Sequence, residues 1–441
     1  MIDIEELLKN EIPKHMLKRA SVTLRAKLKP IRLLIEHRRV PEKGWDDDVI
    51  EFFLTLLSWM DTDKDPEGAQ VGEREARVAS QLVYNLAHGF CHGVGRSGNL
   101  TAPQPKAVGS SLAYLLTNRL ALDMLQRCGA PNLNSTCVLP LATGMAIGLS
   151  VSVARSESKK HVVIYPRVDH KSPLKGMQLA GMNVKTVEPE VDGDAVRTSM
   201  KKVRKAIDAK TAAIVSTTTF FPPREPDDVK AIAKLAAEEG IFHIINNAYG
   251  VQSRQIMKLI QGAIDAGRVD LIIQSTDKNF LTPVGGTILA SPSPRLIEKV
   301  SQAYAGRGSA APIIQFLAAL LSLGLDGYER LRNEQEINRQ MLEEHVKRVA
   351  DKHGERLLDV FNPIAVAMTL NQHEAKKVGH YMYTLRVTGP RVLEETDFGI
   401  CCRRYHSPYI TVNAAIGSTK EDIQSATSAL EKALRHTRKY A

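Results

Sequence analysis

Short apolar runs alternate with helical patterns between residues 161 and 291 of this 441-residue chain. The runs are rich in valine, isoleucine and leucine and too brief for helices, which is typical of buried strands. We therefore predict five strands, at residues 162–165, 212–215, 244–245, 271–273 and 287–289. Repeated strand–helix–strand units predict an α/β fold, in which a mostly parallel sheet has helices on both faces.

The clearest helical pattern lies between the second and third of these runs. It spans residues 226–239, with proline at its start, two aspartates in its first turn and Gly240 as its stop. Ligands of parallel sheets bind at the carboxyl ends of the strands. Asn246, Asn247 and Lys278 are all expected at that edge of the sheet.

Both ends of the chain differ from this pattern. Residues 1–60 have few glycines and apolar side chains at helical spacing, namely Leu28, Ile31, Leu34 and Ile35. The acidic stretch 61–66 is expected to be a connecting loop. After a charged helical segment, apolar runs at 364–370 and 409–412 predict strands of a smaller domain. The predicted division is a basic helical extension at 1–60, a main domain at 61–325 and a small C-terminal domain at 326–441.

Composition indicates a soluble globular protein, with 43% hydrophobic and 24% charged residues. The longest nearly apolar run, 312–325, is interrupted by Gln315 and is too short to cross a membrane. The first residues are acidic, unlike a secretory signal. Five cysteines without a CxxC spacing predict reduced thiols in a cytoplasmic protein, with no metal site and no disulfide framework.

Positive charge is concentrated near the N-terminus. The segment from Lys14 to Arg39 contains nine basic residues and one acidic residue, so it carries +8 of the formal net charge of +10. Concentrated charge attracts a polyanion such as RNA. A solvated helix face is the alternative.

Lys278 follows the apolar run 271–273 and precedes the turn 283–286. This position predicts an ammonium group where a buried strand opens into a loop, which is costly unless the charge is used or lost. A lysine at a strand end is suited to Schiff-base chemistry. The alternative is an amine that extends into solvent.

Other residues are suited to binding anions. Thr143 and Gly144 precede a helical pattern whose first N–H groups can hold a phosphate, although a simple strand-to-helix turn explains them equally well. Glycines at 93, 95 and 98 allow backbone amides to converge, and Arg96 can bind phosphate oxygens with two donors. The segment lacks the Gly-Lys-Ser/Thr ending of a Walker motif. Arg74 and Arg307 lie beside glycines and are otherwise ordinary surface arginines.

Asn246 ends a predicted strand 32 residues before Lys278. A pyridoxal phosphate enzyme of this architecture needs a lysine, a phosphate-binding helix start and a polar side chain at the pyridine nitrogen. That polar group is usually an aspartate. Asparagine would weaken the electron sink, which a reaction with a good leaving group on the β carbon tolerates better than a transamination does.

Taken together, five segments resemble the O-phosphoseryl-tRNA(Sec) selenium transferase family. They are residues 93–98, 104–106, 142–145, 246–253 and 277–280. The resemblance extends from about residue 72 to 324 and more loosely beyond. It implies a pyridoxal-phosphate-dependent transferase fold of the aspartate aminotransferase type (fold type I), with a helical N-terminal extension and a small α+β C-terminal domain.

The resemblance also implies a role for each matching residue. Lys278 would carry pyridoxal phosphate covalently and act as the catalytic base. The other cofactor-binding positions would be Arg74, Thr143 and Gly144 at its phosphate, His170 on its ring and Asn246 at its nitrogen. The phosphoryl group of the substrate would be bound by Arg96, Ser97, Gln104 and Arg307. The tRNA would contact the N-terminal helices, where the candidates are Lys18, Arg19, Arg25, Lys27 and Arg32, some of them expected to point inward.

The implied reaction converts O-phosphoseryl-tRNA(Sec) to selenocysteinyl-tRNA(Sec), with loss of phosphate and addition of selenium from selenophosphate. The implied assembly is a homotetramer in which the loop with Arg96 and Gln104 completes a site at a subunit interface. One alternative is a pyridoxal phosphate lyase, decarboxylase or desulfurase acting on a free amino acid. A desulfurase would need a mobile nucleophilic cysteine, and the sequence shows no clear one. Another alternative is a non-catalytic RNA-binding protein, which an intact Lys278 disfavours.

Overall fold

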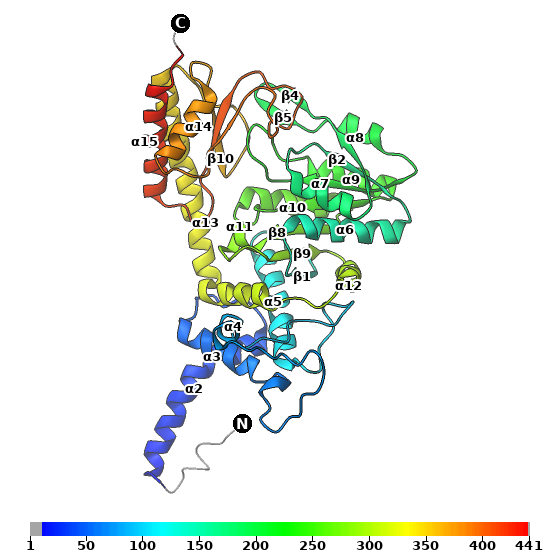
Figure 1. Cartoon of the computed structure of the whole chain (residues 1–441), viewed down its shortest axis with the longest axis vertical. Helices are drawn as coiled ribbons and strands as arrows, with labels where there is room; N and C mark the ends of the chain where they lie inside the picture. The colour runs from blue at the N-terminus through cyan, green and yellow to red at the C-terminus, as the bar shows by residue number, and fades with distance from the viewer. Residues whose placement is uncertain (1–10, 440–441) are drawn as a thin grey trace.

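A seven-stranded sheet forms the centre of the computed structural model, which describes residues 11–439 (Figure 1). Its strand order is β1-β9-β8-β7-β6-β2-β3. Strands β8, β7, β6, β2 and β3 are parallel, and β9 is antiparallel to both of its neighbours. The strands are β1 (Ser135–Leu139), β2 (Val162–Pro166), β3 (Asn183–Val187), β6 (Thr211–Thr217), β7 (Phe242–Asn246), β8 (Leu271–Ser275) and β9 (Thr287–Ser291).

All five strands predicted between residues 161 and 291 are confirmed, as β2, β6, β7, β8 and β9. Every residue of these five strands is buried, which explains their continuous apolar runs. The sequence did not predict β1 or the edge strand β3. In β3 only Val187 is buried, so its composition lacks a strong apolar signal.

Helices cover both faces of the sheet, which confirms the predicted α/β class. On one face, α8 and α9 pack against alternate residues of β2 and β6. On the other, α6 crosses β6 to β9 and packs against α7. The helices that surround the sheet are α5 (Val108–Arg127), α6 (Thr143–Ser158), α7 (Lys171–Leu179), α8 (Met200–Ala206), α9 (Val229–Glu239), α10 (Arg254–Ala266) and α12 (Pro294–Ala303). A short hairpin, β4 (Glu190–Asp192) and β5 (Ala195–Arg197), lies between β3 and α8.

The predicted start of the helix at Pro226 is wrong, because α9 begins at Val229. Asp227 is buried and accepts a hydrogen bond of 2.7 Å from the backbone N–H of Thr217. That contact holds the preceding residues in an extended path. Asp228 is the N-cap, and its side chain accepts from the N–H of Ala231. The predicted stop at Gly240 is confirmed, with Gly240 in the left-handed region.

The N-terminal part is helical, with α2 (Lys14–His37), α3 (Asp47–Ser58) and the short α4 (Gln81–Leu86). Figure 1 shows α2 extending away from the body of the molecule. Ile31 and Leu34 are buried, and Leu28 packs partly against the same core. Ile35 also lies on α2, but it faces solvent and is 50% exposed. Leu28, Ile31 and Leu34 therefore anchor the C-terminal half of this helix to the main core.

The long helix α13 (Ala311–His353) changes direction at Gly324, where φ is 59° (Figure 1). Residues 41–45 fill the break. The N–H of Leu325 donates to Pro41 O and the N–H of Trp45 donates to Leu321 O, each at 2.9 Å. A Cβ on Gly324 would lie 2.5 Å from the Gly44 nitrogen, so only glycine fits this crossing. The N-terminal segment thus satisfies backbone groups that the break leaves without helical partners.

Beyond the break, α13 leads into a smaller α+β unit. Its three-stranded antiparallel sheet has the order β10-β12-β11, and α13, α14 and α15 pack around it. The two strands predicted here are confirmed as β10 (Ala365–Thr369) and β12 (Tyr409–Asn413), with β11 (Arg391–Leu393) added. Its helices are α14 (Ala375–Thr384) and α15 (Lys420–His436). The division of the chain at residues 60 and 325 stays a prediction.

One helix among residues 11–439, α13, is long and apolar enough to pass a length-and-composition test for a membrane span. Half of its most apolar stretch is buried inside the protein. Core helices of soluble proteins pass the same test, so this finding is weak evidence for a membrane.

Candidate active site

Lys278 lies on a short helix, α11 (Thr276–Phe280), directly after β8. The predicted loop is therefore wrong. Asn279 stabilises the helix, because its amide donates to Ser275 O at 2.7 Å and its Oδ1 accepts from the N–H of Val251 at 3.0 Å. The expected burial of the ammonium is also wrong, since the side chain is 48% exposed and Nζ lies 4.0 Å from Asp277 Oδ2. The amine is accessible to a ligand.

The predicted helix start is confirmed at Thr143, the first residue of α6. No side chain caps this end, and the first helical bonds come from the N–H groups of Met145 and Ala146 to Ala142 O. The N–H groups of Thr143 and Gly144 therefore remain available to an anion. Gly144 has a second role, because a Cβ there would lie 2.0 Å from Ser172 Oγ. Glycine is required for the packing of α6 against α7.

His170 precedes α7 and lies near Lys278. Burial lowers the pKa of His170, and the positive charges of Lys278 and Arg391 lower it further. The imidazole is therefore neutral at pH 7, as suits a ring that packs against a cofactor. Arg391, on β11, was not predicted as part of this region. No local sequence pattern points to Arg391, because it lies on a short strand of the smaller unit. The fold brings it near His170, and its guanidinium lies 4.3 Å from the Phe221 ring centre.

Buried polar atoms at this edge of the sheet have no hydrogen-bond partner within the described chain. They include Oδ1 of Asn246, at the end of β7, Oγ1 of Thr217, at the end of β6, and Oγ1 of Thr143. Buried polar groups are rarely left unpaired, so such atoms mark the place of a polar ligand. With the free N–H groups of α6 and the accessible Lys278 amine, they form a donor set that fits pyridoxal phosphate.

A second set of candidates lies around the segment 93–98, which we call the phosphate loop. An antiparallel bridge between Val94 and Gly308 fixes it beside Arg307. The prediction that its backbone amides converge on a phosphate is wrong for two of them. The N–H of Val94 donates to Gly308 O, and the N–H of Arg96 donates to Asn99 O, each at 2.9 Å. Its anion-binding capacity therefore comes from side chains.

Arg307 is partly buried, and its Nη2 donates to the backbone oxygen of His92. No carboxylate pairs with it within residues 11–439. Burial lowers the pKa of Arg307, and the positive charge of nearby Arg74 lowers it further. Arg74 itself is exposed, 3.7 Å from Glu73. Two arginines whose charges repel each other form a site that an anion would stabilise.

The remaining members of this set lie on the phosphate loop and the residues that follow it. Arg96 and Ser97 are exposed. Gln104 is partly buried, and its Oε1 accepts from the N–H of Lys106 at 3.4 Å. Their side chains can therefore reach a ligand outside the chain.

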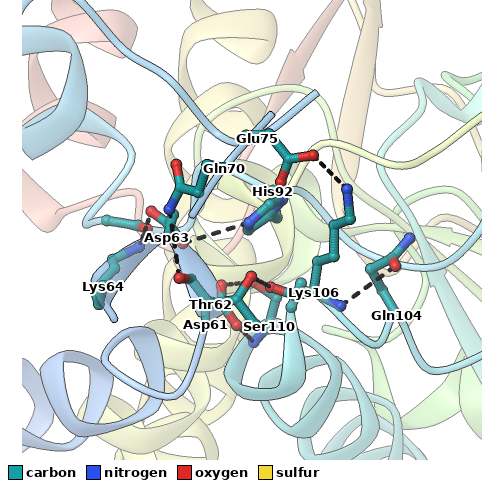
Figure 2. Close-up of polar contacts among 12 residues, drawn as sticks. Asp61, Thr62, Asp63, Lys64, Gln70, Glu75, His92, Gln104, Lys106 and Ser110 are labelled. Atoms are coloured by element: carbon teal, nitrogen blue, oxygen red, sulfur yellow. Dashed lines mark hydrogen bonds and ion pairs between the residues drawn. The ribbon is translucent and has the colours of Figure 1, made fainter. Parts of the chain in front are cut away.

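Figure 2 shows a buried polar network behind this loop, which the sequence did not predict. The stretch 61–66, expected to be a loop, begins with Asp61, which is 2% exposed and accepts from the N–H and Oγ of Ser110. These bonds cap the start of α5. Next to it, η1 (Thr62–Lys64) places Asp63 3.5 Å from His92 Nε2. The partners are separated by about thirty to fifty residues, so no local pattern predicts them.

The segments that carry the two sets touch where Gly308 lies beside Pro140, because a Cβ on Gly308 would be 3.1 Å from Pro140 Cγ. Among residues 11–439, no hydrogen bond or ion pair links the Lys278 set (Lys278, His170, Asn246, Thr143 and Gly144) to the Arg307 set (Arg74, Arg96, Ser97, Gln104 and Arg307). Each set is assembled from distant segments, but separately.

All five cysteines are free. Cys401 is close to His170 in space, because its Sγ accepts from the N–H of Asp169 at 3.2 Å. Its own N–H donates to Asp169 Oδ2 at 2.9 Å, which fixes the residue. Burial raises the pKa of Cys401 to about 12. A fixed, buried thiol is unsuited to the mobile nucleophile that a desulfurase needs. In the described chain, no group of three or more His, Cys, Asp or Glu residues could hold a metal ion.

The fold is shared with solved structures of low sequence identity. A sphingosine-1-phosphate lyase of Burkholderia pseudomallei matches with a TM-score of 0.59 at 17% identity, over 97% of this chain and 91% of that one. A structure described as Oryza sativa TDC with PLP and tryptamine matches with a TM-score of 0.60 at 14% identity, over 88% and 96%. The fold and the lysine after β8 define the class of fold type I pyridoxal-phosphate-dependent enzymes.

More similar relatives specify the family within this class. The family profile described as O-phosphoseryl-tRNA(Sec) selenium transferase, SepSecS, matches residues 60–435. The enzyme of that name from Methanopyrus kandleri is 47% identical over 96% of this chain and 98% of its own length. That of Dictyostelium discoideum is 35% identical over 92% and 93%. The crystal structure of an archaeal member has a TM-score of 0.94 at 42% identity, covering 98% and 100%. This chain belongs to the O-phosphoseryl-tRNA(Sec) selenium transferase family.

Proposed function

We propose that this protein converts O-phosphoseryl-tRNA(Sec) to selenocysteinyl-tRNA(Sec), with pyridoxal phosphate as its cofactor and selenophosphate as its selenium donor. Membership of the family supports the reaction. The observation that carries the proposal is Arg307, a partly buried guanidinium next to a second arginine and without a carboxylate partner in the described chain. Such a site suits the phosphoryl group that distinguishes phosphoserine from serine.

The Lys278 set holds the cofactor in this proposal. Lys278 would attach it, and the α6 N–H groups and Thr143 would hold its phosphate, joined by Arg74 of the Arg307 set. His170 would pack on its ring, and Asn246 would bind its nitrogen. Pyridoxal phosphate, when bound, withdraws electrons from the α carbon of an attached amino acid. Lys278 removes the proton from that carbon as a general base. An amide rather than a carboxylate at Asn246 gives modest electron withdrawal, which suffices where a good leaving group departs.

The Arg307 set binds the leaving phosphate in this proposal. Arg307 and Arg96 donate to its oxygens, while Ser97 and Gln104 complete its coordination. Their positive charge stabilises the phosphate as its bond to the β carbon breaks. Selenium of selenophosphate would then bond to that carbon, a proton would return to the α carbon from Lys278, and water would cleave the Se–P bond to release the second phosphate. Seryl-tRNA would leave these cations without an anionic partner, which disfavours it as a substrate.

We propose that one subunit completes the site of another within a homotetramer. No hydrogen bond or ion pair joins the two residue sets among residues 11–439, and apolar side chains near the phosphate loop are exposed, such as Leu112 at 39% and Leu115 at 46%. A cavity of about 650 Å³, lined partly by these two residues, Gly95 and Gln104, lies beside them. Free thiols support a reducing, cytoplasmic location.

The tRNA is proposed to contact α2. The candidates Lys18, Arg19, Arg25, Lys27 and Arg32 are all exposed, so the prediction that some point inward is wrong. Lys27 forms an ion pair of 2.6 Å with Asp48, and Arg32 lies 3.5 Å from Glu36. These acids offset part of the charge of Lys27 and Arg32. Lys18 and Arg19, farther along the extended part of the helix, are the stronger candidates.

Changing Lys18, Arg19 and Arg25 together to glutamine is expected to weaken tRNA binding and reduce its salt dependence. Each lost phosphate contact lowers the slope of log K against log salt by roughly 0.7 to 0.9. Filter binding at salt concentrations from about 50 to about 300 mM, around the physiological range, measures this slope. A matched control changes Lys230, Lys234 and Lys258, which are exposed on α9 and α10. Equal slopes for the two triple variants would exclude α2 from the interface.

Turnover of labelled phosphoseryl-tRNA with selenophosphate tests the proposed function directly. We expect selenocysteinyl-tRNA as the product and at least a hundredfold lower kcat/KM with free phosphoserine, because the tRNA contacts are absent. Comparable turnover of free phosphoserine would instead favour a lyase acting on a free amino acid.

A further inference from the structure

His92 lies buried behind Arg307, outside the set of residues proposed to touch the substrate. Its side chain is 1% exposed, and its backbone oxygen accepts the hydrogen bond from Arg307 Nη2. Within the described chain, neither ring nitrogen of His92 has a hydrogen-bond partner. Nε of Arg307 is also buried without one. A buried imidazole that makes no hydrogen bond destabilises the fold, so its presence here needs a functional explanation.

Asp63 faces the same imidazole, as Figure 2 shows. Its Oδ1 lies 3.5 Å from His92 Nε2 and is likewise buried without a hydrogen-bond partner in the described chain. Its Oδ2 is held by Lys64 Nζ at 2.6 Å. Hydrogen bonds between such groups are usually 2.7–3.2 Å long. A shift of about half an ångström would therefore close a charged hydrogen bond between His92 and Asp63.

The surroundings keep His92 neutral while Arg307 carries no anion. Burial lowers the pKa of His92, and the positive charges of Arg307 and Lys64 lower it further, against the opposing effect of Asp63 and Asp61. A phosphoryl dianion bound to Arg307 would offset the positive charge of that guanidinium, which repels a proton on His92. The charged and titratable groups around the ring are Asp61, Asp63, Lys64, Glu75, Cys91 and Arg307.

We propose that His92 is a positioning residue for Arg307, which takes up a proton from solution when a phosphoryl group binds. The resulting imidazolium donates to Asp63 Oδ1, and this bond fixes the His92 carbonyl that holds the guanidinium. The inference rests on the proposed function, because it takes Arg307 as the ligand of the substrate's phosphoryl group. Binding of the phosphoryl group is therefore coupled to the uptake of a proton from the buffer by His92.

Calorimetry of inorganic phosphate binding to the holoenzyme tests the proton uptake. Titrations at pH 7.5 in two buffers of different ionisation enthalpy give the number of protons bound. We expect the wild-type enzyme to take up roughly half to one proton more than His92→Gln, because glutamine cannot titrate. Asp63→Asn, which keeps the shape of the side chain, should also reduce the uptake. The proton balance of phosphate itself is the same in all three proteins.

Steady-state kinetics with phosphoseryl-tRNA provide the second measurement. His92→Gln is expected to raise KM about tenfold with kcat within about twofold, and to flatten the rise of KM between pH 6.5 and 8. The control is His88→Asn, whose imidazole also has a buried, unpartnered Nε2 but stacks on Phe90 away from Asp63. Asparagine tolerates the positive φ of 49° at that position.

The outcomes separate this inference from the proposed function. Equal proton uptake in the wild-type enzyme, His92→Gln and Asp63→Asn would overturn the role of His92 alone. A purely structural role would lower the melting temperature without changing the proton count, and it would overturn the inference equally. Failure of the wild-type holoenzyme to bind phosphate at all would overturn the proposed phosphate site and this inference together.

Discussion

Replacing Lys278 with alanine is expected to reduce the turnover of phosphoseryl-tRNA by about a thousandfold or more. The change removes the amine that attaches the cofactor and the base that removes the α proton. Little else in the fold should change, because the side chain is 48% exposed and its one ion pair among residues 11–439 is with Asp277, at 4.0 Å. Single-turnover kinetics, together with borohydride reduction and peptide mapping of the fixed cofactor, measure both losses.

Two control variants distinguish covalent chemistry from charge. Lys278→Arg keeps the positive charge near His170 but cannot attach the cofactor, so it should be as inactive as Lys278→Ala. Lys258→Ala removes an exposed lysine from α10 and should retain full activity. Activity restored by arginine, or borohydride fixation at a different lysine, would contradict the proposed role of Lys278.

Replacing Arg307 with alanine is expected to lower kcat/KM for phosphoseryl-tRNA by about a hundredfold to a thousandfold while the cofactor stays bound. The guanidinium contacts the His92 carbonyl and lies among residues that form no bond with the Lys278 set. Its loss should therefore remove phosphate binding alone. Absorbance of the bound cofactor and the kinetics of phosphate release measure the two effects separately.

Arg307→Lys keeps the charge but loses the paired donors, so we expect an intermediate loss. Arg330→Ala, an exposed arginine on α13, is the matched control and should be unaffected. Loss of cofactor in parallel with activity would contradict the assignment of Arg307 to the substrate. A gain of activity toward seryl-tRNA without loss of activity toward phosphoseryl-tRNA would contradict this assignment as well.

The central strands were predictable because each is buried on both faces and therefore has a continuous apolar run. The edge strand β3 was not, because four of its five residues are at least partly exposed. The start of α9 was misplaced for a different reason. Proline and two aspartates form a strong helix-start signal, but the buried contact of Asp227 with Thr217 overrides it. Tertiary contacts of this kind cannot be predicted from a local sequence pattern.

In the candidate site too, local patterns predicted some features, while others depend on tertiary contacts. The positions of Lys278, shortly after β8, and of Asn246, at the end of β7, follow from short-range patterns. The exposure of Lys278 does not, because it depends on α11, which Asn279 stabilises through contacts with Val251 and Ser275. His92 and Asp63 were missed altogether. An acidic stretch such as 61–66 is usually a solvated loop, and long-range contacts, the bridge from Val94 to Gly308 and the bond from Arg307 to His92, bring Arg307 to it.

The way residues 41–45 fill the break at Gly324 affects how the chain can be shortened. A truncation that begins at residue 60, made to delete the basic helix, would also remove the acceptors of Leu325 and the donor to Leu321. Three main-chain groups in the middle of α13, the carbonyl of Leu321 and the N–H groups of Leu325 and Asp326, would then lose their partners. A shortened enzyme that begins near Val40 keeps those partners but loses the buried side chains of Ile31 and Leu34, so a loss of tRNA affinity can be ascribed to the missing cations only if its melting temperature is unchanged.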